Sequence, residues 1–268
     1  MLLGDEFKNS AKIIDTHCHL DDKAYDGDLS EVLAHSFANN IDKIIIPAAY
    51  PKDLPRAAAL CEAYAPLYFA VGTHPHECEG FDEGFLREFI THPKCVGVGE
   101  CGLDYHYAKA DDTAIKARQR QVFIAQLELA REFAKPVIIH SREANADTFE
   151  ILKEFAPRLV GGVLHCFNAS ELLLNLKDKF YFGIGGVLTF KNAKELPAIL
   201  PKIPLNRLLL ETDAPYLSPQ PFRGQRNEPI LTNLVASKMA EILGLERNEI
   251  IKICTQNSLN LFFKNKEA

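Results

Sequence analysis

The sequence predicts a single-domain (β/α)8 barrel, a TIM-like fold. Short apolar runs rich in β-branched residues recur along the chain, and segments with helical spacing of apolar residues lie between them. The alternation extends over roughly 250 residues, which is the usual size of this fold. Most of the runs are apolar throughout, as expected for parallel strands that are buried on both faces. A doubly wound open sheet is the alternative, because alternation alone does not show that a sheet closes.

The predicted strands are the apolar runs that separate the helical segments. They are Ile13–His17, Lys43–Pro47, Leu67–Gly72, Cys95–Glu100, Pro136–His140, Val160–His165, Phe180–Ile184 and Arg207–Asp213.

Two apolar stripes at helical spacing are clearest, one between these runs and one after the last of them. They consist of Phe123, Leu127, Ala130 and Ala134, and of Leu231, Val235, Met239 and Ile242. A final helix is expected at Asn248–Lys264, packed outside the barrel. Its candidate contacts are Ile250, Ile251, Leu259 and Leu261.

The composition is that of an ordinary globular protein. Of 268 residues, 47% are hydrophobic and 25% are charged. No apolar stretch reaches the length of a membrane span, and the first ten residues lack the apolar run of a signal peptide, so we expect a cytoplasmic protein without membrane contact. The seven scattered cysteines argue against a disulfide framework. A net charge of −6 means that a nucleic-acid substrate would have to be held by a local patch and by metal ions.

Residues that bind metals stand repeatedly where a predicted strand ends. The runs IIDTHCH, VGVGE, PVIIH, GGVLH and LLLETD all end in this way. In a barrel the carboxyl ends of the strands meet at one rim, where active sites lie. A lone histidine at a strand end is more often an ordinary hydrogen-bonded residue, which is what we expect of His35, His92 and His106. Repetition at several strand ends favours a metal centre built from His17, His19, Glu100, His140, His165 and Asp213.

The spacing at the first strand supports this interpretation. Residues two apart on a strand face the same way, so His17 and His19 can reach one ion while Cys18 points away. The same alternation turns Cys101 and Cys166 away from the site. Four imidazoles and two carboxylates could hold two divalent ions with Glu100 as the bridge, and paired ions activate water for hydrolysis. Imidazole-rich ligation suits zinc, manganese or iron, and magnesium could also bind with retained waters.

Further polar residues near these strand ends are candidates for supporting roles. His74 and His76 could contact a phosphate or donate a proton, with loop-stabilising hydrogen bonds as the alternative. Asp104 could orient a metal-bound water or a ligand histidine, and Glu211 is a second candidate for such a supporting role. For Glu211 a buried structural ion pair is an equal alternative.

The loop that follows the Asp213 strand contains Arg223 and Arg226. Guanidinium groups match the geometry of phosphate, so we expect both to bind substrate; an ion-paired loop is the alternative. Tyr105, Tyr107 and Phe222 could stack on bases, although packing explains them equally well.

The chain resembles the TatD family of metal-dependent hydrolases, within the amidohydrolase-like barrels. The resemblance is carried, in the order of the family, by DTHCHLD (Asp15–Asp21), VGTHPHE (Val71–Glu77), GECGLDY (Gly99–Tyr105), KPVIIHSREANADTFEIL (Lys135–Leu152), HCFNAS (His165–Ser170), GGVLTFKNAKEL (Gly185–Leu196) and ETDAPYLSPQPFRGQRNEP (Glu211–Pro229).

The resemblance implies a TIM-like barrel with a divalent-metal centre and phosphodiesterase activity on DNA, often 3′→5′ exonucleolytic. By motif, it carries the metal-ligand role to the same six residues. Members of the family usually start shortly before the HxH pair, so residues 1–11 are expected to be an N-terminal extension and residues 12–268 the barrel. Many members have Thr where this chain has Cys101, a side chain expected to face away. Related amidases often use a carbamylated lysine on strand four, where this chain has Glu100.

The predicted function is therefore that of a metal-dependent hydrolase acting on ester bonds, a deoxyribonuclease. Asp213 is the candidate general base and Glu100 the candidate bridging ligand. His74, Arg223 and Arg226 are the candidate substrate contacts. The alternatives are a metal-dependent C–N hydrolase acting on a small molecule and a non-catalytic metal-binding barrel. Neither a membrane nor an obligate protein partner is expected.

Overall fold

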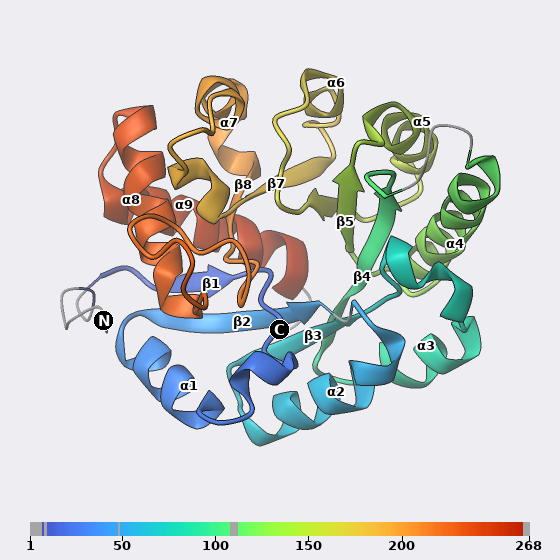
Figure 1. Ribbon diagram of the computed structural model, residues 1–268, viewed down its shortest axis with the longest axis horizontal. Coiled ribbons are helices and arrows are strands. Elements are labelled where there is room, and N and C mark those ends of the chain that lie inside the picture. Colours follow the sequence, from blue (N-terminus) through green and yellow to red (C-terminus); the bar gives the residue numbers. More distant parts are fainter. Residues whose placement is uncertain (1–6, 8–9, 48, 108–111, 265–268) are drawn as a thin grey trace.

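The computed structural model describes the chain except for residues 1–6, 8–9, 48, 108–111 and 265–268. Eight parallel strands form one sheet in which each strand pairs with the next along the chain, and helices α1 to α8 surround the strands (Figure 1). The strands are β1 (Ile13–Asp15), β2 (Ile41–Pro47), β3 (Leu67–Val71), β4 (Cys95–Asp104), β5 (Val137–Arg142), β6 (Gly162–Leu164), β7 (Phe180–Ile184) and β8 (Leu208–Leu210).

The connections between strands are helical. The α-helices are α1 (Leu29–Ala38), α2 (Leu54–Ala63), α3 (Glu83–Ile90), α4 (Thr113–Glu132), α5 (Asn145–Phe155), α6 (Glu171–Leu174), α7 (Glu195–Ile199), α8 (Thr232–Leu243) and α9 (Arg247–Ser258). Short 3₁₀ segments are η2 (Lys23–Tyr25), η3 (Pro51–Asp53), η4 (Pro75–Gly80), η5 (Gly186–Thr189), η6 (Leu200–Lys202), η7 (Leu205–Arg207) and η8 (Pro229–Leu231). A π-helical segment, η9 (Leu259–Phe263), continues α9.

The first and last strands meet just beyond their ends, and we call this contact the β1–β8 seam. The backbone N–H of Asp213 donates to the carbonyl of His17 at 2.8 Å, and that of His19 donates to the carbonyl of Ala214 at 2.7 Å. These bonds bring the two edges of the sheet together, so the predicted barrel is confirmed and the open-sheet alternative is wrong.

A buried carboxylate reinforces the β1–β8 seam. Asp15, at the end of β1, accepts hydrogen bonds from the Thr212 backbone N–H at 3.0 Å and from the Thr212 hydroxyl at 2.6 Å. A buried carboxylate is tolerated when its oxygens are satisfied in this way. The bonds join residues 197 positions apart in sequence.

The strand side chains divide into two cores because neighbouring residues point to opposite faces. Ile14, Ile45 and Val163 belong to a small cluster inside the barrel, and a larger cluster fills the space between the strands and the helices. Phe262 and Phe263 of η9 also belong to the inner cluster. The final helix was expected to pack outside the barrel. Ile250 and Ile251 of α9 belong to the outer cluster, as predicted, whereas the end of the segment packs against the inner residues, where Phe262 and Phe263 are buried.

The strand limits differ from the predicted ones where ligand residues lie. β7 has the predicted bounds, whereas β4 continues past Glu100 to Asp104. β1, β6 and β8 end earlier than predicted, so that His17, His165 and Asp213 follow their strands. Positive φ angles at Cys166 (43°) and Asp213 (57°) take the chain out of the extended conformation there.

The predicted N-terminal extension is described only in part. Residues 1–6 and 8–9 lie outside the described residues. Phe7 is buried, with the Arg247 guanidinium 4.8 Å from its ring centre, and the Ala11 N–H donates to the Asn248 side chain at 3.2 Å. Within the described part of the chain, no helix is both long enough and apolar enough to cross a membrane.

Candidate metal centre

The six predicted ligands converge at the carboxyl ends of the strands, with Glu100 at their centre. Its Oε2 lies 3.3 Å from His17 Nε2 and 3.9 Å from His19 Nε2. Its Oε1 lies 2.9 Å from His140 Nδ1 and 2.8 Å from His165 Nε2. The two oxygens of one carboxylate therefore face two different pairs of imidazoles.

Asp213 lies on the same side as the first imidazole pair. Its Oδ1 is 3.4 Å from His19 Nε2 and 3.6 Å from His17 Nε2. We call His17, His19 and Asp213 the first set, and His140 and His165 the second set. Glu100 stands between the two sets, as a bridging ligand would.

The backbone of β4 next to Glu100 lies close to the backbones of β3 and β5, and this places Glu100 at the centre of the site. A side chain at Gly99 would place its Cβ 2.5 Å from the Ile138 carbonyl oxygen, and φ at Gly99 is +152°. A Cβ at Gly72 would lie 2.4 Å from the Gly99 carbonyl carbon. Only glycine avoids both the contact and the unfavourable φ, so β3, β4 and β5 can pack tightly beneath the carboxylate.

The carboxylates of the site are held in the ionised form. Burial by itself would raise the pKa of Glu100, but His165, His74 and His140 outweigh it and hold that pKa well below its usual value. Burial also opposes ionisation of Asp213, and the hydrogen bond with His19 and the nearby imidazoles lower its pKa on balance. Two buried negative charges in one site require positive charge beside them.

The imidazoles respond to this charge in different ways. Burial and the proximity of His165 lower the pKa of His17 to about 4, so it is neutral and has a lone pair available. For His19 and His140 burial is outweighed by carboxylate partners, which raise each pKa to about 9. Converging imidazole nitrogens and ionised carboxylates are the donors that bind divalent transition metals, so this site fits such ions.

Asp104, near the end of β4, holds two histidines. Its Oδ2 lies 3.0 Å from His140 Nε2 and 3.1 Å from His76 Nε2. In the neutral form of His140 that would bind an ion, Nε2–H donates to this carboxylate and Nδ1 carries the lone pair on the side of Glu100. This geometry agrees with the predicted role of Asp104, which is to orient a ligand histidine.

His74 differs from the proposed ligands in its hydrogen bonding. Its Nδ1 accepts a hydrogen bond from the His76 backbone N–H at 3.2 Å. Burial lowers the pKa of His74 to about 3, so the ring is neutral and carries its proton on Nε2. Nε2 lies 3.5 Å from Glu100 Oε1, at the edge of the site. A protonated nitrogen cannot bind a metal, so His74 is suited to donate a hydrogen bond to a substrate.

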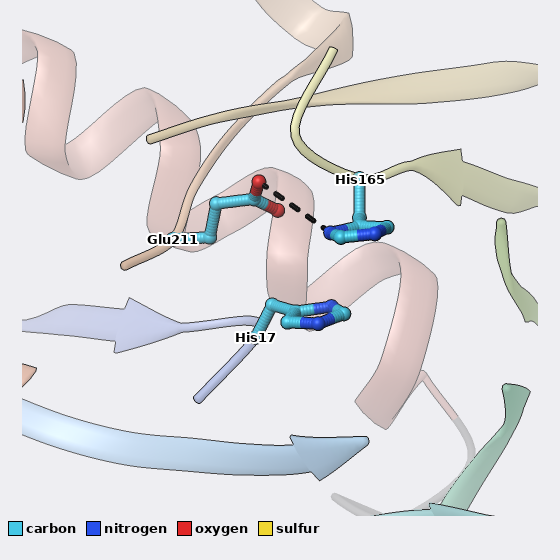
Figure 2. Close-up of side chains that lie close together, drawn as sticks. All are labelled: His17, His165 and Glu211. Atoms are coloured by element: carbon cyan, nitrogen blue, oxygen red, sulfur yellow. Dashed lines mark ion pairs between the residues drawn. The ribbon is translucent and has the colours of Figure 1, made fainter. Parts of the chain in front are cut away.

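Glu211 lies behind the centre and beside His165 (Figure 2). Its Oε1 accepts a hydrogen bond from the Cys166 backbone N–H at 2.5 Å and is 4.0 Å from His165 Nδ1. The His165 ring stacks on the His17 ring, with centres 3.9 Å apart. A Cβ at Gly183 would lie 2.0 Å from Glu211 Oε2, so this glycine provides the space for the carboxylate.

Glu211→Gln tests whether this carboxylate supports the metal centre. Burial raises the pKa of Glu211 to about 8, and its Oε1 is 4.0 Å from His165 Nδ1. Above pH 8, where the carboxylate is ionised and attracts the His165 Nδ1–H, we expect the amide to lower metal affinity about 10- to 100-fold, and below pH 8 we expect a smaller loss. Competition with a chromophoric zinc chelator measures the affinity. Glu241→Gln, on the exposed face of α8, is the matched control. If metal affinity is unchanged and the melting temperature falls, Glu211 has only a structural role.

Neither loop arginine lines the pocket above the metal centre. The Arg226 guanidinium forms two bonds of 2.7 Å with the Asp28 carboxylate and one of 2.9 Å with Glu228. The Arg223 guanidinium lies 3.8 Å from the centre of the Phe190 ring. These contacts favour the ion-paired alternative for Arg226, because Nη1 and Nη2 already have partners and Nε is buried.

The aromatic candidates separate by exposure. Phe222 is buried against Ile230 and Leu231, so it is a packing residue. The Tyr105 hydroxyl donates to Asp147 at 2.6 Å. Tyr107 is 73% exposed.

Two of the three histidines expected to have ordinary roles lie beside a carboxylate. His92 lies 3.2 Å from Glu62, and His106 lies 2.5 Å from Glu143. His35 is part of α1.

The metal centre forms the floor of a pocket of about 600 Å³. Sequence analysis did not identify the residues of its outer wall, which lie on connections rather than at strand ends. They include Asp21, Asp22, Lys23, Tyr50, Lys52, Asp53, Arg56 and Tyr216.

Comparisons with known proteins agree on one family. A family model described as TatD related DNase matches residues 14–263. The chain is 40% identical to the uncharacterized metal-dependent hydrolase YabD of Bacillus subtilis, over 93% of this chain and 98% of that one. It is 34% identical to the 3′-5′ ssDNA/RNA exonuclease TatD of Edwardsiella piscicida, over 93% and 99%. The solved structure of YjjV, a TatD homologue from Escherichia coli, superposes with a TM-score of 0.84 at 35% identity, covering 93% and 97%.

Proposed function

Because the chain belongs to the family of TatD-related DNases, we propose that this metal-dependent hydrolase cleaves phosphodiester bonds of single-stranded DNA from the 3′ end. The observation that carries the proposal is the position of Glu100, whose two oxygens face the first and second sets. A relative named as a 3′-5′ exonuclease aligns over almost its whole length, and this supports the polarity.

We assign a divalent ion to each set. The first would be held by His17, His19, Asp213 and Glu100 Oε2, and the second by His140, His165 and Glu100 Oε1. The many imidazole nitrogens suit zinc, manganese or iron better than magnesium. When bound, paired ions of this kind polarise a phosphoryl oxygen and lower the pKa of water.

Residues of the chain would supply the proton chemistry. Asp213 is ionised and stands at the edge of the first set, so we assign to it the acceptance of a proton from the attacking water. His74 Nε2–H would donate a hydrogen bond to a non-bridging phosphate oxygen. In the reaction the oxygen of water bonds to phosphorus, the P–O bond to the leaving strand breaks, and that strand takes up a proton.

We assign a phosphate contact to Arg223 and a stabilising ion pair to Arg226. We expect Arg223→Ala to raise KM for DNA and to weaken its salt dependence, because one phosphate contact fewer releases fewer counterions. Arg226→Ala should leave KM unchanged and lower the melting temperature by about 2–4 °C, because it removes the pair with Asp28. Steady-state kinetics at several salt concentrations and thermal melts measure both. An Arg226→Ala variant with raised KM and unchanged melting would reverse the assignment.

The function is tested with purified protein and 5′-labelled single-stranded DNA. With manganese or magnesium, we expect a ladder of products shortened one nucleotide at a time, and EDTA should abolish it. Products shortened from the 5′ end would overturn the polarity. DNA left intact by folded, metal-loaded protein across several ions would overturn the nuclease assignment, and small amides would be the next substrates to assay. Glu100 stands where related amidases often carry a bridging lysine, and this favours the phosphodiesterase.

A further inference from the structure

The outer wall of the pocket is built from three connections that meet above the metal centre. Lys23 comes from η2, Tyr50 and Lys52 from the connection between β2 and α2, and Tyr216 from the segment that follows β8. All four line the same pocket as Glu100. The volume of about 600 Å³ is within the range of small-ligand sites.

Two tyrosine rings on this wall are open to solvent. Tyr50 is 41% exposed and Tyr216 is 50% exposed. The Tyr216 hydroxyl donates to Asp22 at 2.8 Å, and its ring lies edge-on to His19 at 5.9 Å between centres. The position of this ring is therefore fixed. An aromatic face held open beside a reaction centre offers a stacking surface, and every nucleobase has a complementary π-face.

Two lysines accompany the tyrosines. The Lys52 ammonium lies 5.4 Å from the centre of the Tyr50 ring. Within the described part of the chain, neither Lys23 nor Lys52 is recorded in an ion pair, whereas Arg56 on the same wall is paired with Asp26 at 2.5 Å. The lysines are therefore available to an anion.

The acids of this wall limit the kind of ligand that fits. Asp22 already accepts from the Tyr216 hydroxyl and from the Ala24 N–H, and Asp21 is buried. With Asp53 they offset much of the positive charge, so the wall is not a general polyanion groove. Recognition must come mainly from the aromatic faces, with a lysine to position one phosphate.

We propose that Tyr50, Lys52 and Tyr216 form a nucleotide subsite beside the metal centre, in which a nucleobase stacks on the tyrosine faces and Lys52 holds the adjoining phosphate. The proposal rests on the nuclease function and adds the residues that seat the strand end. Selection by stacking rather than by hydrogen bonds makes the subsite tolerant of base identity, as progressive shortening of any sequence requires.

Binding to a hydrolysis-resistant probe tests the subsite. The probe is a deoxythymidine trinucleotide with phosphorothioate linkages, and its partner is the same trimer without the 3′-terminal base. Calorimetry on the manganese-loaded protein should show roughly 5- to 100-fold tighter binding of the complete trimer. Tyr50→Ala should remove this preference, and Tyr50→Phe should retain it. Leu205→Ala, which removes an exposed apolar side chain of η7 outside the pocket lining, should also retain it.

Equal binding of the two trimers by the wild type, or a preference that survives in both Tyr50→Ala and Tyr216→Ala, overturns the subsite. Circular dichroism shows whether each variant is folded. If Tyr50→Ala is not folded, the binding preference of Tyr216→Ala decides the test. If the protein shortens DNA but binds the two trimers equally, the nuclease function stands and the subsite is refuted. If the protein prefers the complete trimer but does not shorten DNA, the nucleotide-binding site stands and the nuclease function is refuted.

Discussion

Replacing Glu100 with glutamine is expected to lower kcat for DNA hydrolysis by at least about three orders of magnitude. The amide has nearly the same size, so the change removes charge with little change in volume. Both carboxylate oxygens face imidazoles, at 2.8 Å on one side and 3.3 Å on the other, so one substitution weakens both sets. Measured metal content should fall at both positions.

The control for this experiment is Glu143→Gln, which changes an exposed carboxylate that contacts His106. Its kcat and metal content should equal those of the wild type. Circular dichroism and thermal melts establish that the Glu100→Gln chain is folded. A folded variant that binds two ions and keeps kcat within tenfold of the wild type would contradict the bridging role.

Asp213→Asn should lower kcat by about two to four orders of magnitude, because the amide cannot accept the proton of the attacking water. Its carbonyl can still bind a cation weakly. The second set does not include this residue, so one ion should remain at saturating metal. This pattern separates Asp213→Asn from Glu100→Gln, in which both positions are weakened.

Single-turnover kinetics and metal analysis measure these two consequences together. Asp178→Asn is the control, since that residue lines a separate pocket, with Phe262 of the inner cluster, and not the one above the metal centre. If Asp213→Asn retains both ions and the full single-turnover rate, Asp213 is not the general base. Loss of all metal would show that it acts mainly as a ligand.

The sequence was sufficient to predict the barrel and the convergence of the six candidate ligands. Apolar strands ending in His, Glu or Asp indicate one rim, because parallel strands all end on the same side. His17, His165 and Asp213 were expected on strands and instead follow them. The backbone turns at Cys166 and Asp213 through positive φ angles. Such angles are uncommon for residues other than glycine, so the residue types gave no indication of them.

Contacts between distant segments could not be predicted from local patterns. Arg226 pairs with Asp28, which is 198 residues away in sequence, and this pairing is decided by how the loop after β8 folds back against α1. Tyr50 and Tyr216 likewise come together only in the closed barrel. Neither lies at a strand end or in an apolar stripe, so spacing carried no information about them.

The β1–β8 seam also determines when in the life of the chain a reactive centre can exist. His17 and Asp213 are joined by a backbone hydrogen bond of 2.8 Å, and both belong to the first set. A chain still leaving the ribosome has β1 but lacks β8, so it cannot assemble that set. An ion in the first set would bind only after β8 has closed the ring, and its binding would then oppose reopening by mass action. The first set is therefore complete only when synthesis of the chain is almost finished.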